Sequence, residues 1–396
     1  MFHDWVTHRV LSIPELLHPY PQNRTMAITA FTEENNTPSL LTQKIRDHIT
    51  TNGSIPFREF MAYALYDAEQ GYYAGNQQRV GKGGDFITSV SVGRCFGLIL
   101  AHRLERYWRE IGSPEDFHII EPGAHDGALC ADIIAEIQRS FPDFYRAVTY
   151  NLIETTEKLR LAQTARLTDE YAGKFKIHPR LSILSGLTGA MISNELVDAM
   201  PVDLIRRQNN HWLLLMVDLD AHGDFCFSPT TIPDEYRELI DFCKNLTDFP
   251  EGYTTEFQPK LRSFARESSQ ALGKGLFITI DYGHHGEDYY HPDRTEGTLQ
   301  TYHSHQKSDN PLTTPGEIDI TAHVDFTRLN TEMEAAGFQH RSLGSQASYL
   351  THQAKNWLIG MEQEPSSETP ALLRQFQTLT HPAMLGTRFM VLEMEK

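Results

Sequence analysis

The 396-residue sequence contains no uninterrupted apolar run of about 18 residues, so it predicts no membrane-spanning helix. Ahead of Met26 it also lacks the continuous apolar core of a secretory signal peptide. This leading segment is poor in acids and carries a few basic residues. An organelle-targeting leader therefore stays open as an alternative, and we favour a disordered leader.

Metal-ligand spacing is missing as well. The four cysteines form no CxxC pair, and we expect free thiols in a reducing compartment; they are Cys95, Cys130, Cys226 and Cys243. Histidines are frequent after Asp281, but no HExxH pattern accompanies them. The histidines weighed as ligands are His284, His285, His291, His303, His305 and His323. We predict no metal site, and a metal-dependent hydrolase remains an alternative.

Positive charge is scarce. The sequence contains 35 Lys and Arg residues and 52 Asp and Glu residues, which gives a formal net charge of −17. Such a chain repels a phosphate backbone, so generic nucleic-acid binding is not expected. A basic protein partner remains compatible with this charge.

Short apolar runs alternate with amphipathic stretches from Phe117 onward. We expect strands at residues 117–121, 148–154, 181–184, 189–196 and 275–283. We expect helices at residues 92–108, 126–141 and 155–171. Continuous apolar strands separated by helices are typical of a parallel sheet that is covered on both faces. The predicted fold class is therefore α/β, and ligands of such sheets bind at the carboxyl ends of the strands.

The remaining stretches suggest a domain organisation. Residues 1–37 are predicted to be a flexible lead-in, and residues 38–115 a helical segment with a loop that covers the cofactor. In that segment we expect helices at residues 38–49 and 55–73, with Gly71 near the end of the second. Residues 116–396 would form the main domain, with insertions at about 203–256 and 284–320. Long insertions at strand ends commonly build a substrate lid or platform.

The stretch "IIEPGAHDGAL" predicts a ligand-binding turn after the first strand. Gly123 and Gly127 allow a tight turn and a close approach of the backbone to a ligand. A nicotinamide site would favour GxGxxG and a pyrophosphate, whereas here acids flank the turn. Glu121 ends the first strand, and Glu154 ends the next strand, where it can bind both ribose hydroxyls. Acids suit a phosphate-free nucleoside with a cationic group, which is S-adenosylmethionine.

Two further stretches complete the predicted site. In "GKGGDFITS", Asp85 could bind the ammonium of the cofactor, while Thr88 offers a hydroxyl or caps the next helix. In "ISNELVDAMPV", Asn194, Glu195 and Asp198 follow a strand and are expected to form the catalytic edge.

Two carboxylates at that edge could hold a guanidinium in a bidentate manner and could accept the proton lost on methylation. We also expect Asn194 to contact the cofactor. Glu256 is a weaker candidate for orienting the acceptor, and His323 a polar or acid–base partner.

Four segments carry a family resemblance: "GKGGDFITS", "NELVDAMPV", "IDYG" and "GTLQTYHSHQKSDNPLTTPGEIDITAHVDF". With them the sequence resembles the MidA/NDUFAF-type family of class I S-adenosylmethionine-dependent methyltransferases over about residues 38–395. The resemblance implies a seven-stranded, mostly parallel, Rossmann-like sheet. It places the cofactor loop on Gly84, Asp85 and Phe86. The turn departs from the family pattern GPGRGTL, since it reads GAHDGAL.

The resemblance also implies a function. Mitochondrial members are complex I assembly factors and protein arginine methyltransferases, so the implied acceptor is a protein arginine, with a complex I subunit as a candidate partner. The implied location is mitochondrial in a eukaryote and cytoplasmic in a bacterium. A homodimer, the acceptor and the number of methyl groups stay open. The alternatives are a small-molecule methyltransferase, a non-catalytic assembly factor that binds S-adenosylmethionine, and a nicotinamide oxidoreductase.

Overall fold

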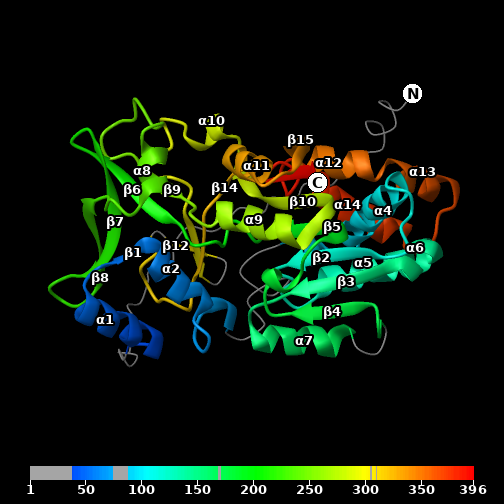
Figure 1. The fold of residues 1–396 in the computed structure, drawn as a ribbon, viewed down its shortest axis with the longest axis horizontal. Helices are drawn as coiled ribbons and strands as arrows, with labels where there is room; N and C mark the ends of the chain where they lie inside the picture. Colours follow the sequence, from blue (N-terminus) through cyan, green and yellow to red (C-terminus); the bar gives the residue numbers. More distant parts are fainter. Residues whose placement is uncertain (1–37, 75–87, 168–170, 304–305, 309) are drawn as a thin grey trace, which may run out of the picture. The chain divides into compact units, whose positions relative to one another are not determined.

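A mostly parallel sheet of eight strands is the largest sheet among the described residues (Figure 1). The structure is a computed structural model, and it describes residues 38–74, 88–167, 171–303, 306–308 and 310–396. Seven strands lie on one path, in the order β15 (Gln339–Ser345), β16 (Phe389–Glu395), β10 (Leu272–His284), β5 (Leu187–Asn194), β2 (Phe117–Pro122), β3 (Val148–Ile153) and β4 (Phe175–His178). The eighth, β14 (Val324–Asp325), pairs with the end of β10. This arrangement confirms the predicted α/β class.

Strand directions follow from the connections. Strands β4, β3, β2, β5 and β10 run parallel to one another, whereas β16 runs antiparallel to β10 and β15. The central parallel strands are mostly apolar because both of their faces are buried. In β10, for example, Leu276, Ile278 and Ile280 belong to the hydrophobic core on one face of the sheet. Phe277, which lies between the first two, belongs to the core on the other face.

Helices cover the two faces of this sheet. One face carries α4 (Cys95–Glu110), α5 (Ala128–Ser140), α6 (Pro142–Ala147), α12 (Gln346–Gln353), α13 (Lys355–Gln363) and α14 (Thr369–Thr380). The other carries the 3-10 turn η3 (Leu181–Ile183), α9 (Leu261–Ala271) and α11 (Phe326–Ala335). Helix α3 (Ser89–Val92) precedes α4, and α7 (Glu157–Leu167) follows β3.

The two insertions and the N-terminal helices pack together, and we call them the accessory lobe. Its sheet contains β1 (Ile55–Pro56), β6 (Asp203–Gln208), β7 (His211–Leu219), β8 (Phe225–Thr231) and β9 (Thr254–Phe257). Its helices are α1 (Leu40–Asn52), α2 (Phe57–Tyr66), the 3-10 turn η1 (Tyr72–Ala74), α8 (Arg237–Cys243) and α10 (Gly286–Tyr289). A small third sheet contains β11 (Gln300–His303), β12 (Gln306–Ser308) and β13 (Asp319–Thr321).

Side chains of the lobe's sheet point alternately to its two faces, so the sheet packs against helices on both faces. In β6, Leu204 packs with α1 and α2, whereas its neighbour Ile205 packs with α8 on the opposite face. Ile320 of β13 joins the same core as α1 and α2. Arg58 of α2 also contacts Asp203 of β6, with 2.5 Å between Nη1 and Oδ2. The N-terminal helices therefore share a core with both insertions.

Two expectations about local structure are wrong. Residues 181–184 do not form a strand but the 3-10 turn η3, and the strand of that region lies earlier, at β4. Pro179 follows β4 directly and, having no N–H, cannot donate to a continuing ladder.

The second helix ends at Tyr66, before Gly71. The Asp67 carboxylate accepts the N–H groups of Glu69 and Gln70, both at 3.1 Å, and so closes a turn in place of another helical turn. Within the described part of the chain, we find no helix long and apolar enough to cross a membrane.

Candidate active site

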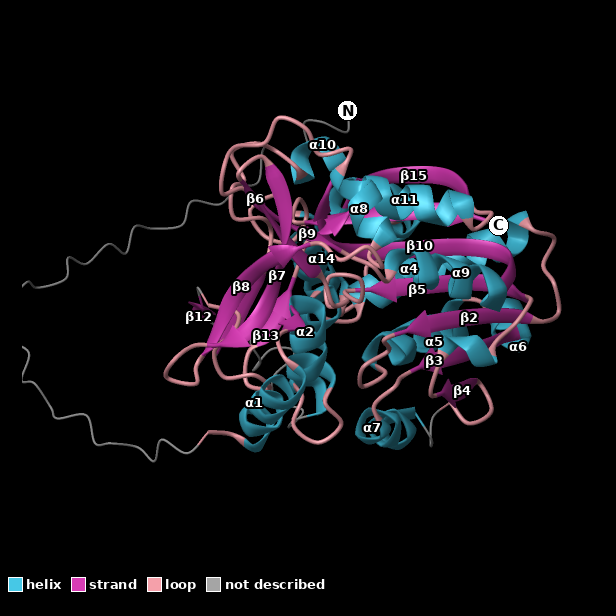
Figure 2. Ribbon diagram, turned by 60° about the vertical axis from the view of Figure 1, so that its left-hand side comes forward, coloured by secondary structure: helices cyan, strands magenta, loops and turns pink. Residues whose placement is uncertain are grey.

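A pocket of about 1310 Å³ lies at the carboxyl ends of β2, β3 and β5. Figure 2 shows these strand ends pointing toward the accessory lobe, which supplies part of the pocket lining. Thr88, at the start of α3, also lines the pocket, and its hydroxyl caps that helix by accepting the Ser91 N–H at 3.0 Å. The location agrees with the rule that open α/β sheets bind ligands at their strand ends.

The turn between β2 and α5 has the conformation that its glycines permit. Gly123 and Gly127 have φ values of 72° and 79°. These positive φ values favour glycine, and a Cβ atom on Gly123 would also lie 2.8 Å from Cδ1 of Leu196. Gly127 precedes α5 directly, and the backbone N–H of Gly123 bonds the Ile153 carbonyl at 2.9 Å.

Glu121 is buried at the end of β2. It accepts a hydrogen bond from the Tyr150 hydroxyl at 2.6 Å. Burial raises the pKa of Glu121 to about 8, in spite of that hydrogen bond. Without a bound cation this carboxyl therefore holds its proton at neutral pH.

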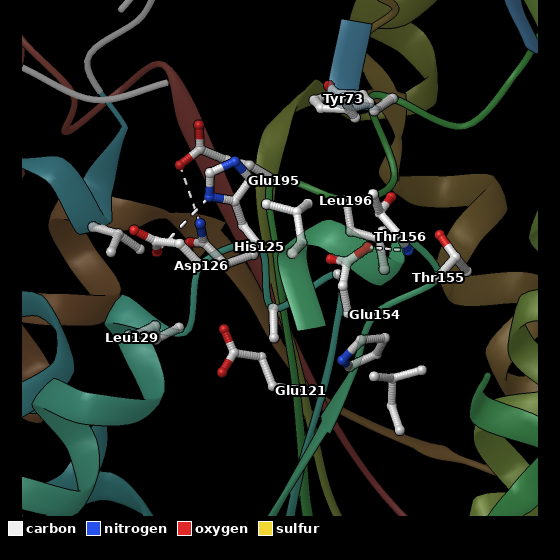
Figure 3. A pocket seen from close by; sticks show the side chains of 18 of the residues that line it. Tyr73, Glu121, His125, Asp126, Leu129, Glu154, Thr155, Thr156, Glu195 and Leu196 are labelled. Carbon is white, nitrogen blue, oxygen red and sulfur yellow. Dashed lines mark hydrogen bonds and ion pairs between the residues drawn. The ribbon is translucent and has the colours of Figure 1, made fainter. Parts of the chain in front are cut away.

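Glu154 lies immediately after β3, across the pocket from Leu129 (Figure 3). One carboxylate oxygen accepts the Thr156 N–H at 2.9 Å, which orients the side chain. Burial raises the pKa of Glu154, and the hydrogen bond from Thr156 opposes that rise. The two carboxyls expected to bind the cofactor thus line the same pocket.

Two residues of the turn that depart from the family pattern, His125 and Asp126, also face the pocket. The side chains of His125 and Asp126 both line it, and His125 has a φ of 44°. Asp126 is 2.5 Å from Nη2 of Arg166 on α7. This ion pair holds the turn against α7, and the hydrogen bond from His125 helps to lower the pKa of Asp126 against the effect of burial. The GAHDG sequence therefore keeps the tight turn.

The segment after β5 presents the predicted catalytic edge. Asn194, Glu195 and Asp198 all line the pocket. Oε1 of Glu195 accepts hydrogen bonds from the Ser89 N–H at 3.2 Å and from Asn194 Nδ2 at 3.1 Å. Burial, and then repulsion by Asp198, raise the pKa of Glu195 to about 8. Glu195 is held with a φ of 48°, a conformation that is strained for a residue with a side chain.

Asp281, at the end of β10, explains how this segment keeps its shape. Its Oδ2 atom accepts the backbone N–H groups of Leu196, Val197 and Asp198 at 3.2, 2.9 and 3.3 Å. Burial and the Glu195 charge raise the pKa of Asp281 to about 7. Burial, followed by Asp281 and Asp319, raises the pKa of Asp198 well above its ordinary range. Asp281 is fully buried beneath the segment and positions it.

The lining residues without a role in the sequence-based predictions include Tyr66, Tyr73 and Asp319. They come from α2, η1 and β13, all in the accessory lobe. The Tyr73 hydroxyl donates to Asp319 Oδ1 at 3.2 Å. Asp319 could have been suspected as an acid within the apolar run "IDITAHV", but its position facing Asp198 depends on the packing of the lobe.

The remaining predicted residues have different outcomes. Gly84, Asp85 and Phe86 lie outside the described residues. His323 is not among the lining residues; its ring stacks on Tyr282, which does line the pocket, with 6.4 Å between ring centroids.

Glu256 is also outside the lining. Its Oε1 atom accepts the backbone N–H groups of Thr298 and Leu299 at 2.6 and 2.8 Å. Its Oε2 atom accepts the Tyr289 hydroxyl at 3.1 Å. The expected contact of Glu256 with an acceptor is therefore wrong, because this carboxylate holds a turn of the accessory lobe.

The histidines do not gather into a ligand set in the described part of the chain. There, no group of three or more His, Cys, Asp or Glu residues is arranged to hold a metal ion. His284 and His323 contact each other, with 3.0 Å between Nε2 and Nδ1. Burial, then the charges of His284 and Arg294, lower the pKa of His323 to about 4, so it is neutral at physiological pH.

The pocket fits S-adenosylmethionine. The Gly123 turn leaves backbone rather than side chain beside the pocket. Oδ1 of Asn194 is buried and has no hydrogen-bond partner among the described residues, so it is available to a ligand donor. Glu154 supplies a carboxylate for hydroxyl groups. Of the two arginines that line the pocket among the described residues, Arg166 is paired with Asp126.

Comparison with known proteins agrees with this fit. Residues 99–343 match the family model described as "Putative S-adenosyl-L-methionine-dependent methyltransferase". The match spans more than half of the chain, so the chain belongs to this family of methyltransferases, whose methyl donor is S-adenosylmethionine.

Curated relatives are named as methyltransferases that act on arginine in proteins. The chain is 28% identical to the Drosophila melanogaster mitochondrial protein arginine methyltransferase NDUFAF7 homolog, over 89% of this chain and 84% of the relative. It is 26% identical to mitochondrial protein arginine methyltransferase NDUFAF7 of Rattus norvegicus, over 90% and 84%.

Solved structures share the fold. A Burkholderia thailandensis protein crystallised with S-adenosylhomocysteine is 27% identical, with a TM-score of 0.80 over 90% of this chain and 92% of that one. A native crystal structure from the same organism is 26% identical, with a TM-score of 0.78 over 90% and 91%.

Proposed function

We propose that this methyltransferase transfers the methyl group to a side-chain nitrogen of arginine in a protein substrate. The observation that carries the proposal is the group of carboxyls from Glu195, Asp198 and Asp319 on the cofactor-binding pocket. Such a group favours a cation, and a guanidinium offers several donors in a planar fork that carboxylates can bind. The names of the curated relatives support the same acceptor.

The cofactor side of the pocket would be formed by the residues expected from the sequence. Glu154 would accept hydrogen bonds from the ribose hydroxyls, and Glu121 with Asn194 would face the cationic amino acid part. Gly123 and Gly127 would let the backbone approach the ligand. Thr88 lines the pocket and would close it from the side of α3.

The acceptor side would position the nitrogen and take up a proton. S-adenosylmethionine supplies a methyl group from its sulfonium, whose bonding electron pair returns to sulfur. The arginine nitrogen that gains the methyl must release one proton, and Glu195 would accept it at a carboxylate oxygen. A carboxyl whose pKa lies near neutrality is suited to this step. Asp198 would hold the guanidinium, and positioning provides most of the acceleration.

The partner and the location follow from the family resemblance. The substrate protein we propose is a subunit of respiratory complex I, in mitochondria if the chain is eukaryotic. The word "mitochondrial" in the names of the curated relatives supports this location. For a bacterial chain we propose the cytoplasm. A homodimer stays a prediction.

Labelling tests the proposal directly. The full chain is incubated with radiolabelled S-adenosylmethionine and host-cell lysate, and the labelled proteins are hydrolysed to amino acids. We expect methylarginine in the hydrolysate, and no label with Glu195→Gln. Label confined to small molecules would support a small-molecule methyltransferase instead. An absence of all transfer, with S-adenosylhomocysteine still bound, would favour the non-catalytic assembly factor.

A further inference from the structure

Tyr66 presents a fixed aromatic ring to the pocket. Its hydroxyl donates to the Ala199 carbonyl at 2.7 Å, which anchors the side chain to the segment after β5. Tyr66 is nevertheless 42% exposed as a residue, and it lines the pocket. An anchored ring that stays exposed inside a pocket is a surface on which a ligand can stack.

Tyr73 and Asp319 continue this surface. The rings of Tyr66 and Tyr73 lie 5.5 Å apart at an angle of 33°. The Tyr73 hydroxyl donates to Asp319 Oδ1, so ring and carboxylate form one unit. Asp319 is only 6% exposed and lines the pocket. In the view of Figure 3, Tyr73 lies at the end of the pocket opposite Glu121.

This unit faces the catalytic edge. The backbone N–H of Ala322, directly after β13, bonds the Asp198 carbonyl at 2.9 Å, which holds β13 beside the segment after β5. Asp198 is also 6% exposed. Two buried carboxyls thus face one pocket from two separate parts of the chain. Their charged forms are costly to bury side by side, and a cation between them would lower that cost.

We propose that Asp319, Tyr73 and the ring of Tyr66 form an outer wall of the acceptor site that selects a planar guanidinium over the ammonium of lysine. This inference rests on the proposed function. A guanidinium can stack its face on an aromatic ring while its edge donates to carboxylates on both sides. An ammonium is a compact point charge, which neither stacks in this way nor spans two walls.

Four variants of the full chain test the outer wall. Asp319→Asn removes the charge and keeps the shape, and Tyr73→Phe removes only the hydroxyl. Asp288→Asn is the matched control, because Asp288 is an exposed acid of the same insertion outside the pocket lining. Asp319→Glu restores the charge. Each is assayed by methyl transfer into lysate protein, with S-adenosylhomocysteine affinity from calorimetry.

The expected pattern separates recognition from folding. Loss of one charge-assisted hydrogen bond predicts that Asp319→Asn lowers kcat/KM about tenfold or more, mainly through KM. Tyr73→Phe should lower it about threefold, and Asp319→Glu should recover part of the loss. S-adenosylhomocysteine affinity should stay within about twofold of the wild type in all four, since the cofactor side is unchanged.

Each failure has its own signature. Methylarginine formation by Asp319→Asn and Tyr73→Phe at the rate of Asp288→Asn would overturn the outer wall and leave arginine methylation standing. If Asp319→Asn also fails to bind S-adenosylhomocysteine, Tyr73→Phe decides, because it keeps the ring. A wild-type protein that yields methyllysine, or no methylated protein, would overturn the proposed function and the selection of guanidinium with it.

Discussion

The cofactor side of the pocket comes mainly from one short stretch of chain, whereas the acceptor side is assembled from distant ones. Glu121, the glycine turn and Glu154 follow one another through β2, α5 and β3. On the acceptor side, Tyr66, Glu195 and Asp319 meet from α2, the segment after β5 and β13. The first side depends on local backbone geometry, and the second depends on how the accessory lobe packs against the sheet. We therefore expect variants of the two sides to affect different measurable quantities.

The largest expected effect is on the acceptor side. Glu195→Gln keeps the size of the side chain but removes the proton acceptor, so we expect kcat to fall about a hundredfold. S-adenosylhomocysteine affinity should change by less than about twofold. Methyl incorporation and calorimetry on the same sample measure both. If S-adenosylhomocysteine affinity and kcat fell by the same factor, Glu195 would belong to the cofactor side. The distinction between the two sides of the pocket would then be contradicted.

A smaller and opposite pattern is expected on the cofactor side. Glu154→Gln loses the charge that would bind the ribose hydroxyls, so we expect S-adenosylhomocysteine to bind about tenfold more weakly. Glu157→Gln is the matched control, because Glu157 is an exposed acid at the start of α7, outside the pocket lining. Calorimetric titration measures the difference. Equal affinities for the two variants would leave Glu154 without a role in cofactor binding.

The smallest expected effect is on the pH dependence of stability, to which one carboxyl group from each side of the pocket contributes. The pKa values of Glu121 and Glu195 are raised from 4.5 to about 8, chiefly by burial. Between these values the unfolded chain has released protons that the folded chain retains, so stability falls as pH rises from about 4.5 to about 8. Below this window the contribution is fully present.

The thermal midpoint of the cofactor-free protein, measured across this range, checks the effect. Glu121→Gln and Glu195→Gln should each flatten the decline of the midpoint, since each removes one titrating group. Variants whose midpoints decline in parallel with that of the wild type would contradict the raised pKa values on both sides of the pocket.

Sequence patterns predicted the main sheet well because its strands are apolar on both faces. The runs around Ile120, Leu152 and Phe277 are buried strands, as expected. The same reasoning wrongly predicted a strand at residues 181–184. A short apolar run can also form a turn that packs against a helix, as η3 does against α9. Glu256 was misjudged because an acid near a strand end has no signature that separates ligand binding from support of a turn.

By itself, the sequence determined the α/β class, the glycine turn and the acids at the strand ends, because each depends on periodicity or on backbone conformation within a few residues. Only the tertiary structure decided that Asp281 holds the segment bearing Asp198 and that Asp319 faces this segment from the accessory lobe. These contacts join residues that lie far apart in the chain. The position of Asp319 arises because the insertions bury an apolar core against α1 and α2 within the accessory lobe, and no local pattern encodes where that packing places a carboxyl group.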